Sequence, residues 1–285
     1  MTVAFQYFPL FCYTLDILLE HVLCCLKTKP KNITLDPNLR QAELLSPHRK
    51  HSYLQILSST FSRSNLKMAP KRVAIVISST RTPRLNPTIT RYVHDVLTSD
   101  PTIPTSHSGT IDTDPRHITF EILDLAKQSL PLYDESVIPA GLPAADPTPH
   151  YSKAHTRAWS AVVRQYDAFI FVTPQYNWSI PASLKNALDY LFFEWRGKPA
   201  GIVSYGGRGG GKAADHLRGV LSGLHMRVVG TAPALPVKFT AFPVGELEED
   251  KVQLDERDIA GWKEAGIEGM MRNLGMELVC ELDKE

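Results

Sequence analysis

The sequence predicts an α/β domain in which a five-stranded parallel sheet is covered by helices on both faces. Two segments, VAIVIS at 73–78 and AFIFVT at 168–173, are apolar up to their last residue, as strands buried on both faces of a sheet are. Strand-like and helix-like segments alternate from residue 70 to the end of the chain, which is typical of parallel sheets with crossover helices. The roughly 215 residues of this region suffice for one such core.

The expected elements follow one another along the chain. The predicted strands cover residues 73–78, 118–125, 168–173, 200–205 and 226–235. The predicted helices cover residues 88–97, 152–166, 181–193, 212–223 and 256–274. Two Pro-rich stretches, 99–117 and 129–150, are expected to be surface loops. In the strand order 2-1-3-4-5, a ligand would bind where the order reverses, between the first and third strands.

Residues 1–69 differ in composition from the rest of the chain. They contain 8 Lys and Arg against 4 Asp and Glu, together with three of the four cysteines. Asp16 and Glu20 interrupt the apolar stretch 3–26, which disfavours a membrane-spanning helix, and the lack of a preceding Lys or Arg disfavours a secretory signal. We therefore predict one folded domain over 70–285, preceded by an extension that is largely disordered or a gene-model artefact. Membrane contact through 3–26 is the less favoured alternative.

Charge and cysteine content exclude some classes of protein. The chain carries 31 Lys and Arg against 30 Asp and Glu, and this balance argues against a dedicated nucleic-acid binder. Beyond residue 69 the only cysteine is Cys280, so the domain has no internal disulfide. This usage fits a reducing compartment, and we expect a cytoplasmic protein.

The loop after the first strand, residues 78–88, has the composition of a phosphate site. Asn86 is a suitable helix N-cap and Pro87 a suitable first helical residue, so free backbone N–H groups at the helix start would attract an anion. The surrounding hydroxyl and guanidinium groups belong to Ser79, Thr80, Thr88, Arg81 and Arg84. The alternative is a polar loop with two solvated arginines.

The loop after the third strand, TPQYNWSIP at 173–181, is suited to a flat heteroaromatic ring. It combines a rigid proline with the amides of Gln175 and Asn177 and the rings of Tyr176 and Trp178. Amides can pair with ring heteroatoms, while aromatic side chains line the ring faces.

The loop after the fourth strand, SYGGRGGGK at 204–212, is close to the phosphate loop of nucleotide hydrolases. Ala213, however, stands where such loops carry the hydroxyl that holds Mg²⁺, so nucleotide hydrolysis is a disfavoured alternative. The preferred interpretation is a glycine turn that lets the backbone approach a ring or a second nucleotide closely.

Together these loops resemble those of the NADPH-dependent FMN reductase family, the flavodoxin-like quinone and azo-dye reductases. The motifs are SSTRxxRxNP, TPQYNWSIPxxLKNALD and SYGGRGGG, in that order. The resemblance covers about residues 71–235 and implies a flavodoxin-like three-layer sandwich with sheet order 2-1-3-4-5. One departure is Ser78, where family members usually have Gly.

The resemblance also implies which residues bind FMN. It places the FMN phosphate on Ser79, Arg81, Arg84 and Asn86. It places the isoalloxazine ring and ribityl chain against Pro174, Gln175, Tyr176, Asn177, Ser204, Gly206 and Gly207. Arg208 is a candidate for binding the NADPH phosphate. Neither a metal nor a catalytic protein residue is expected, because the flavin carries the chemistry. Surface or capping roles are expected for His155, His216 and His225.

The implied activity is that of an NAD(P)H-dependent oxidoreductase with a ping-pong mechanism. NADPH would reduce bound FMN and leave, and a quinone, azo compound or free flavin would then take the electrons from the same slot. A homodimer or homotetramer is implied, with helix 181–193 near the interface. Phe192, Phe193 and Trp195 suit that interface, the substrate slot or core packing equally well. The alternative function is an FMN-binding redox sensor or partner-docking module with little turnover.

Overall fold

The computed structural model describes residues 70–105, 117–240 and 252–284. The expectations for residues 1–69 lie outside these ranges. The strands that form the sheet are β1 (Lys71–Ile77), β2 (Ile118–Asp124), β3 (Ala168–Pro174), β4 (Pro199–Gly206), β5 (Arg227–Val228) and β6 (Ala234–Pro236). Their order is β2-β1-β3-β4-β5, all pairs are parallel, and β6 also pairs with β4. The predicted fold class and strand order are therefore confirmed.

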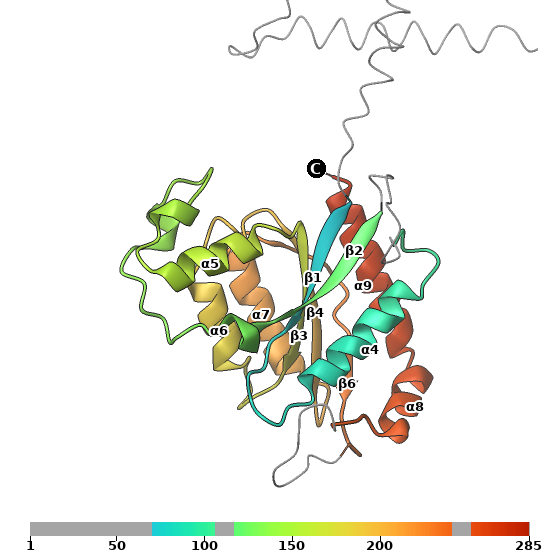
Figure 1. The fold of residues 1–285 in the computed structure, drawn as a ribbon. Helices are drawn as coiled ribbons and strands as arrows, with labels where there is room; N and C mark the ends of the chain where they lie inside the picture. Colours follow the sequence, from blue (N-terminus) through green and yellow to red (C-terminus); the bar gives the residue numbers. More distant parts are fainter. Residues whose placement is uncertain (1–69, 106–116, 241–251, 285) are drawn as a thin grey trace, which may run out of the picture. The chain divides into compact units, whose positions relative to one another are not determined.

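Helices cover both faces of this sheet (Figure 1). One layer consists of α4 (Asn86–Thr98), α8 (Glu256–Glu264) and α9 (Ile267–Leu282). The other consists of α5 (Ala154–Val163), α6 (Ala182–Asp189) and α7 (Gly211–Gly223). The predicted helices 152–166 and 181–193 are shorter in the structure, and short 3-10 turns, η2 (Leu125–Gln128), η3 (Pro139–Gly141) and η4 (Thr148–His150), punctuate the region from β2 to α5.

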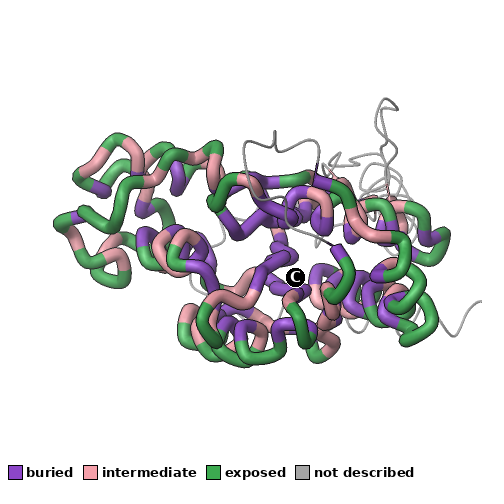
Figure 2. Tube along the Cα trace, turned by 90° about the horizontal axis from the view of Figure 1, so that it is seen from below, coloured by how far each residue is buried: buried purple, intermediate pink, exposed green. Residues whose placement is uncertain are grey.

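The core has two halves, one on each side of the sheet. Along β1, Val73 and Ile75 pack toward α4 and α9, whereas Ala74 and Val76 belong to the cluster with α5, α6 and α7. Buried segments consequently run through the middle of the domain, and exposed segments lie on its outer side (Figure 2). This two-sided burial explains why β3, and β1 from Val73 onward, are largely apolar rather than alternating. Trp195 lies fully within the second half, against Phe169, so it packs in the core.

The prediction of a single fifth strand at 226–235 was wrong. Two short strands occupy this stretch, with β5 beside the start of β4 and β6 beside its end. Between them the chain leaves the ladder, because the backbone N–H of Thr231 donates to Glu277 of α9 (2.9 Å) and Pro233 has no N–H to donate.

The prediction of one last helix at 256–274 was also wrong. Two helices, α8 and α9, meet at Gly266, whose φ of +69° is left-handed and ends helical geometry. The second helix continues to Leu282 and buries Met271, Leu274 and Leu278 against the sheet. Within the described ranges, no helix is long and apolar enough to cross a membrane.

Candidate cofactor-binding site

Three loops leave the same edge of the sheet, because β1, β3 and β4 are parallel neighbours. They follow Ile77, Pro174 and Gly206, the last residues of these strands. The order of the strands reverses between β1 and β3, which is the point where open α/β sheets bind ligands. The structure thus brings together the three loops that carry the sequence motifs.

Asn86 has a different local role from the one predicted. The residue is the first of α4 rather than its cap, and Leu85 precedes it without a capping side chain. Its fully buried side-chain amide instead links the loop after β1 to β3. The Oδ1 atom accepts from the backbone N–H of Ser79 (2.8 Å), and Nδ2 donates to the carbonyl of Val172 (3.0 Å). The amide therefore fixes the course of the loop after β1 relative to β3.

Arg84 forms a buried ion pair with Asp124. Its Nη1 and Nη2 donate to the two carboxylate oxygens of Asp124, at 2.8 and 2.7 Å, and Nη1 also donates to the carbonyl of Ser79 (2.6 Å). Both side chains are almost fully buried. The forked geometry is the one that arginine favours with carboxylates. Arg84 thus links the loop after β1 to the end of β2.

Asp124 was not identified from the sequence. It is the last residue of β2, and its side chain also accepts from the backbone N–H of Ala126 (3.0 Å), which caps η2. The available signal was its position, because a carboxylate at the carboxyl end of a strand next to β1 lies within reach of the loop after β1.

A hydrogen bond joins the loops after β1 and β3. The hydroxyls of Ser79 and Tyr176 are 2.8 Å apart, and Arg81 contributes its backbone N–H to Ser79 Oγ (3.4 Å). Two loops separated by about a hundred residues of chain are therefore in contact at the switch point.

Residues 176–179 form a tight two-residue turn. The backbone groups of Tyr176 and Ser179 exchange N–H···O bonds of 2.9 and 3.0 Å, and Asn177 and Trp178 between them have φ of +46° and +69°. This geometry suits Asn but is strained for a bulky residue, by about 1–2 kcal/mol. Trp178 is nevertheless 70% exposed, and such strain on an exposed ring is typical of functional sites.

The glycine loop after β4 is shaped by its own backbone. Gly209 and Gly210 have φ of +85° and +78°, and a Cβ on Gly210 would lie 2.6 Å from the carbonyl oxygen of Tyr205. Ser204, which the resemblance places beside the flavin, is buried and donates to the carbonyl of Gly209 (2.8 Å). Its hydroxyl therefore holds this turn in shape.

Gln175 connects the loop after β3 to the glycine loop. Its backbone N–H donates to the carbonyl of Tyr205 (3.0 Å), and its side-chain Oε1 accepts from the backbone N–H of Lys212 (3.1 Å) at the start of α7. Gly207, next to this junction, has open space where a Cβ would be, and Arg208 is exposed. The backbone of the glycine loop is therefore accessible at Gly207.

The residues at this edge fit FMN. The loop after β1 offers hydroxyls and the Arg81 guanidinium to a phosphate, while the negative charge of Asp124 is paired with Arg84. The fully buried Ser78 Oγ has no hydrogen-bond partner among the described residues, as expected of a loop that a polar ligand completes. The open backbone at Gly207 and the amides of the 174–177 loop suit a flat ring.

The three histidines lie apart from one another. His155 Nε2 contacts Asp134 Oδ1 (2.7 Å), His216 Nδ1 contacts the hydroxyl of Ser179, and His225 packs edge-on against Phe192. His216 thereby supports the turn that carries Trp178. Within the described ranges, no group of three or more His, Cys, Asp or Glu side chains could hold a metal ion.

The comparisons with known proteins agree with these loops. Residues 71–240 match the family described as NADPH-dependent FMN reductase. The chain is 41% identical over 175 residues to the NAD(P)H-dependent FMN reductase LOT6 of Saccharomyces cerevisiae, covering 60% of this chain and 85% of the relative. It is 37% identical over 201 residues to the NAD(P)H-dependent FMN reductase ntnL of Nectria sp, covering 68% and 89%.

A solved structure supports the fold. An oxidoreductase from Corynebacterium diphtheriae superposes with a TM-score of 0.50 at 16% identity, covering 76% of this chain and 98% of that one. At this identity the likeness concerns the fold alone. The family match, by contrast, spans more than half of the chain and includes all three loops of the site. The chain therefore belongs to the NADPH-dependent FMN reductase family.

Proposed function

We propose that this protein reduces quinones, azo compounds or free flavins with electrons from NADPH, through bound FMN and by a ping-pong mechanism. The observation that carries the proposal is the Ser79–Tyr176 hydrogen bond, because it joins a phosphate-type loop to a ring-binding loop at the switch point. When bound, FMN takes a hydride from NADPH and passes two electrons to the acceptor.

In this proposal the first loop holds the phosphate through two kinds of residue. Ser79 and Arg81 contact it with a hydroxyl and a guanidinium group. Arg84 and Asn86 keep the loop in position, because their polar groups form hydrogen bonds with Asp124, Ser79 and Val172. A buried pair that holds a loop supports binding without touching the ligand.

The ring and ribityl chain would lie against the other two loops. We propose that Pro174, Gln175, Tyr176 and Asn177 would contact them from the loop after β3, and Gly206 and Gly207 from the loop after β4. Ser204 contributes by holding the glycine turn. Arg208, exposed in that turn, remains our candidate for binding the NADPH phosphate.

The test combines a spectrum with kinetics of the two half-reactions. We expect purified protein to retain FMN. Addition of NADPH without an acceptor should bleach the visible absorbance of the bound FMN, and a quinone should restore it. Parallel lines in double-reciprocal plots at several quinone concentrations support ping-pong turnover. Protein that binds FMN but is not reduced by NADPH is a sensor instead, and protein that does not bind FMN at all refutes the proposal.

We further propose a cytoplasmic homodimer or homotetramer with α6 near the interface. Cys280 is the free cysteine of the described part of the chain, as a reducing compartment allows. Phe192 and Phe193, which follow α6, are partly exposed and pack edge-on against each other. Sedimentation velocity measures the assembly, and a strictly monomeric enzyme would contradict it.

A further inference from the structure

The three-residue strand β6 supports the glycine loop. Its residues, Ala234–Pro236, pair with the last three residues of β4, which lead into that loop. Just beyond β6, the backbone N–H of Val237 donates to the carbonyl of Gly206 (2.9 Å). Just before it, the carbonyl of Pro233 accepts from the backbone N–H of Ser204 (3.0 Å). The position of β6 therefore determines where the glycine loop begins.

The glycine loop also folds back onto β6. At Gly209, whose φ is +85°, an added Cβ would lie 3.1 Å from the Cβ of Ala234. Strands of three residues are at the short end of the usual range, and among the described strands β6 pairs with β4 alone. The place of β6 consequently depends on the groups that hold its two ends.

Asp258, on α8, holds the segment that follows β6. The residue is 3% exposed, and its carboxylate accepts the backbone N–H groups of three successive residues, Lys238, Phe239 and Thr240, at 2.8–3.2 Å. The Thr240 hydroxyl also donates to it (2.7 Å). Burial by itself would raise the pKa of Asp258, but these hydrogen bonds lower the pKa below its ordinary value. The carboxylate is therefore charged at neutral pH, with all of these bonds in place.

Glu277, on α9, holds the segment that precedes β6. Its carboxylate accepts from both the backbone N–H (2.9 Å) and the hydroxyl of Thr231. Trp262 of α8 adds a neutral bond at the end of the strand, since its Nε1 donates to the carbonyl of Pro236 (2.7 Å). Carboxylates from two different helices therefore hold β6 from its two ends.

The same group of bonds reaches the helix that follows the loop after β1. The backbone N–H of Asp255, directly before α8, donates to the hydroxyl of Thr240 (2.9 Å). Val252, three residues earlier, is 3% exposed, and its carbonyl accepts from the hydroxyl of Thr88 in the first turn of α4 (2.9 Å). Hydrogen bonds and short pieces of chain thus connect the start of α4, near the proposed phosphate position, to the glycine loop, near the proposed ring position.

We infer that Asp258 and Glu277 are positioning residues for FMN: by holding β6 at both ends, they fix the glycine loop relative to the first turn of α4. The inference rests on the proposed function, because only a flavin that contacts both loops would sense their relative position. Protein groups beside the ring tune the electronics of a flavin, so a displaced glycine loop should change both the affinity for FMN and the spectrum of the bound flavin. A carboxylate that only stabilised the fold would leave the bound flavin unchanged.

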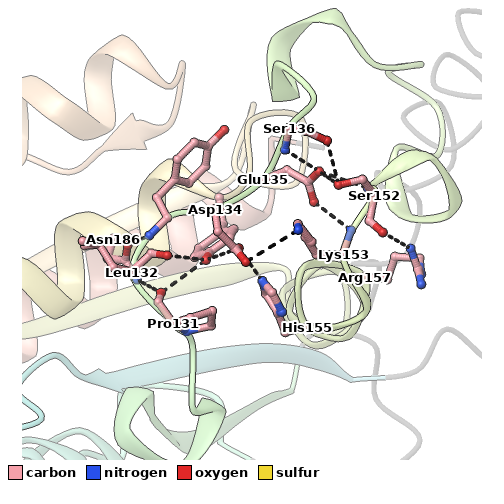
Figure 3. A network of polar contacts seen from close by, with 12 residues as sticks. Pro131, Leu132, Asp134, Glu135, Ser136, Ser152, Lys153, His155, Arg157 and Asn186 are labelled. Atoms are coloured by element: carbon pink, nitrogen blue, oxygen red, sulfur yellow. Dashed lines mark hydrogen bonds and ion pairs between the residues drawn. The ribbon is translucent and has the colours of Figure 1, made fainter.

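Two variants and one matched control test the inference. Asp258→Asn and Glu277→Gln each replace an accepting oxygen by an NH₂ group, which cannot accept from the N–H groups of the segments around β6. Glu135→Gln is the control, because Glu135 is also a buried carboxylate that accepts backbone N–H groups, those of Ser152 and Lys153, both at 3.1 Å (Figure 3). Those bonds hold the loop between η2 and α5, away from β6.

The first measurement is the Kd for FMN, by equilibrium dialysis of the full-length holoprotein, with urea unfolding to rank the stability of the variants. We expect Asp258→Asn to raise this Kd at least tenfold and Glu277→Gln about threefold. Glu135→Gln should stay within twofold of wild type, although it is destabilised as well. Loss of a negative charge would by itself strengthen binding of the anionic FMN phosphate, so weaker binding in Asp258→Asn reports the position of the loop rather than the charge.

The second measurement is the visible circular dichroism of the bound flavin, recorded with every variant saturated with FMN. The signal reports the surroundings of the ring and does not depend on turnover. We expect it to change in Asp258→Asn and Glu277→Gln and to match wild type in Glu135→Gln.

Two results would overturn the inference. One is an FMN Kd in Asp258→Asn that is unchanged or lower, and the other is an equal loss of affinity in Asp258→Asn and Glu135→Gln, which would show that affinity merely follows stability. If Asp258→Asn does not fold, Glu277→Gln decides by the same comparison with Glu135→Gln. Wild-type protein that does not bind FMN refutes the proposed function instead, so the two failures are distinguished before any variant is made.

Discussion

Removing either partner of the Arg84–Asp124 pair should weaken FMN binding, even though we assign neither residue a contact with FMN. Both side chains are almost fully buried, and three charge-assisted hydrogen bonds of 2.6–2.8 Å converge on the guanidinium. Breaking a buried pair by removing one partner costs about 3–5 kcal/mol. For a domain of this size each kcal/mol lowers the Tm by about 2–4 °C. Arg84→Ala should therefore lower the Tm of the apoprotein by roughly 6–20 °C.

The effect on the cofactor distinguishes positioning from direct binding. Arg84→Ala releases the carbonyl of Ser79 and leaves the charge of Asp124 uncompensated beside the phosphate loop. Asp124→Asn removes that charge but also removes the anchor of Arg84. If the pair acts by holding the loop, both variants should raise the Kd for FMN at least tenfold, which corresponds to about 1.4 kcal/mol.

The assay is quenching of FMN fluorescence by apoprotein, with urea unfolding as the stability measurement. The double variant Arg84→Met, Asp124→Leu serves as the control, because apolar replacement of both partners restores fold stability relative to the single variants. We expect it to refold well but still to bind FMN weakly. Asp124→Asn that binds FMN as tightly as wild type, or more tightly, would refute the positioning role and make Arg84 a direct phosphate ligand.

Three further predictions follow from the loops. The pKa of Glu135 is about 2 against an ordinary 4.5, so its ionised carboxylate contributes up to about 3 kcal/mol to the free energy of unfolding, which is present above pH 4.5 and lost as the pH falls toward 2. Glu135→Gln should therefore flatten the pH dependence of the urea midpoint in that window, and an unaltered slope would contradict this prediction. Trp178→Gly should raise the Tm by relieving about 1–2 kcal/mol of backbone strain while lowering kcat/KM for NADPH or acceptor; a lower Tm argues against the strain. Gly210→Ala should lower the Tm by several degrees, because the new Cβ would clash with the carbonyl oxygen of Tyr205. Gly207→Ala, where the Cβ meets open space, should leave the apoprotein Tm unchanged but weaken FMN binding. Equal losses of Tm in both variants would contradict this account.

Much of the fold was predictable because it follows from local pattern. Long apolar runs such as those in 73–78 and 168–173 are typical of strands covered by helices on both faces, and the alternation of strands and helices then indicates a parallel sheet. The interruptions of the predicted fifth strand and of the predicted last helix were harder to predict from the sequence. Gly266 is a residue that can end a helix, but a glycine within a helical pattern does not by itself show that it adopts the left-handed φ that separates α8 from α9. The gap between β5 and β6 depends on Glu277, which lies 46 residues beyond Thr231 in the chain.

The sequence by itself determined which three loops meet at the candidate site, because motif spacing and strand order place them at one edge of the sheet. Only the tertiary structure decided how the polar side chains in those loops are used. The Arg84 guanidinium is paired with Asp124, 40 residues away, and the Asn86 amide joins Ser79 to Val172 instead of capping α4, and neither pairing could be predicted from the sequence. The physical reason is that a buried charge or amide must be paired, and its partner comes from another strand that is adjacent only after the sheet has assembled.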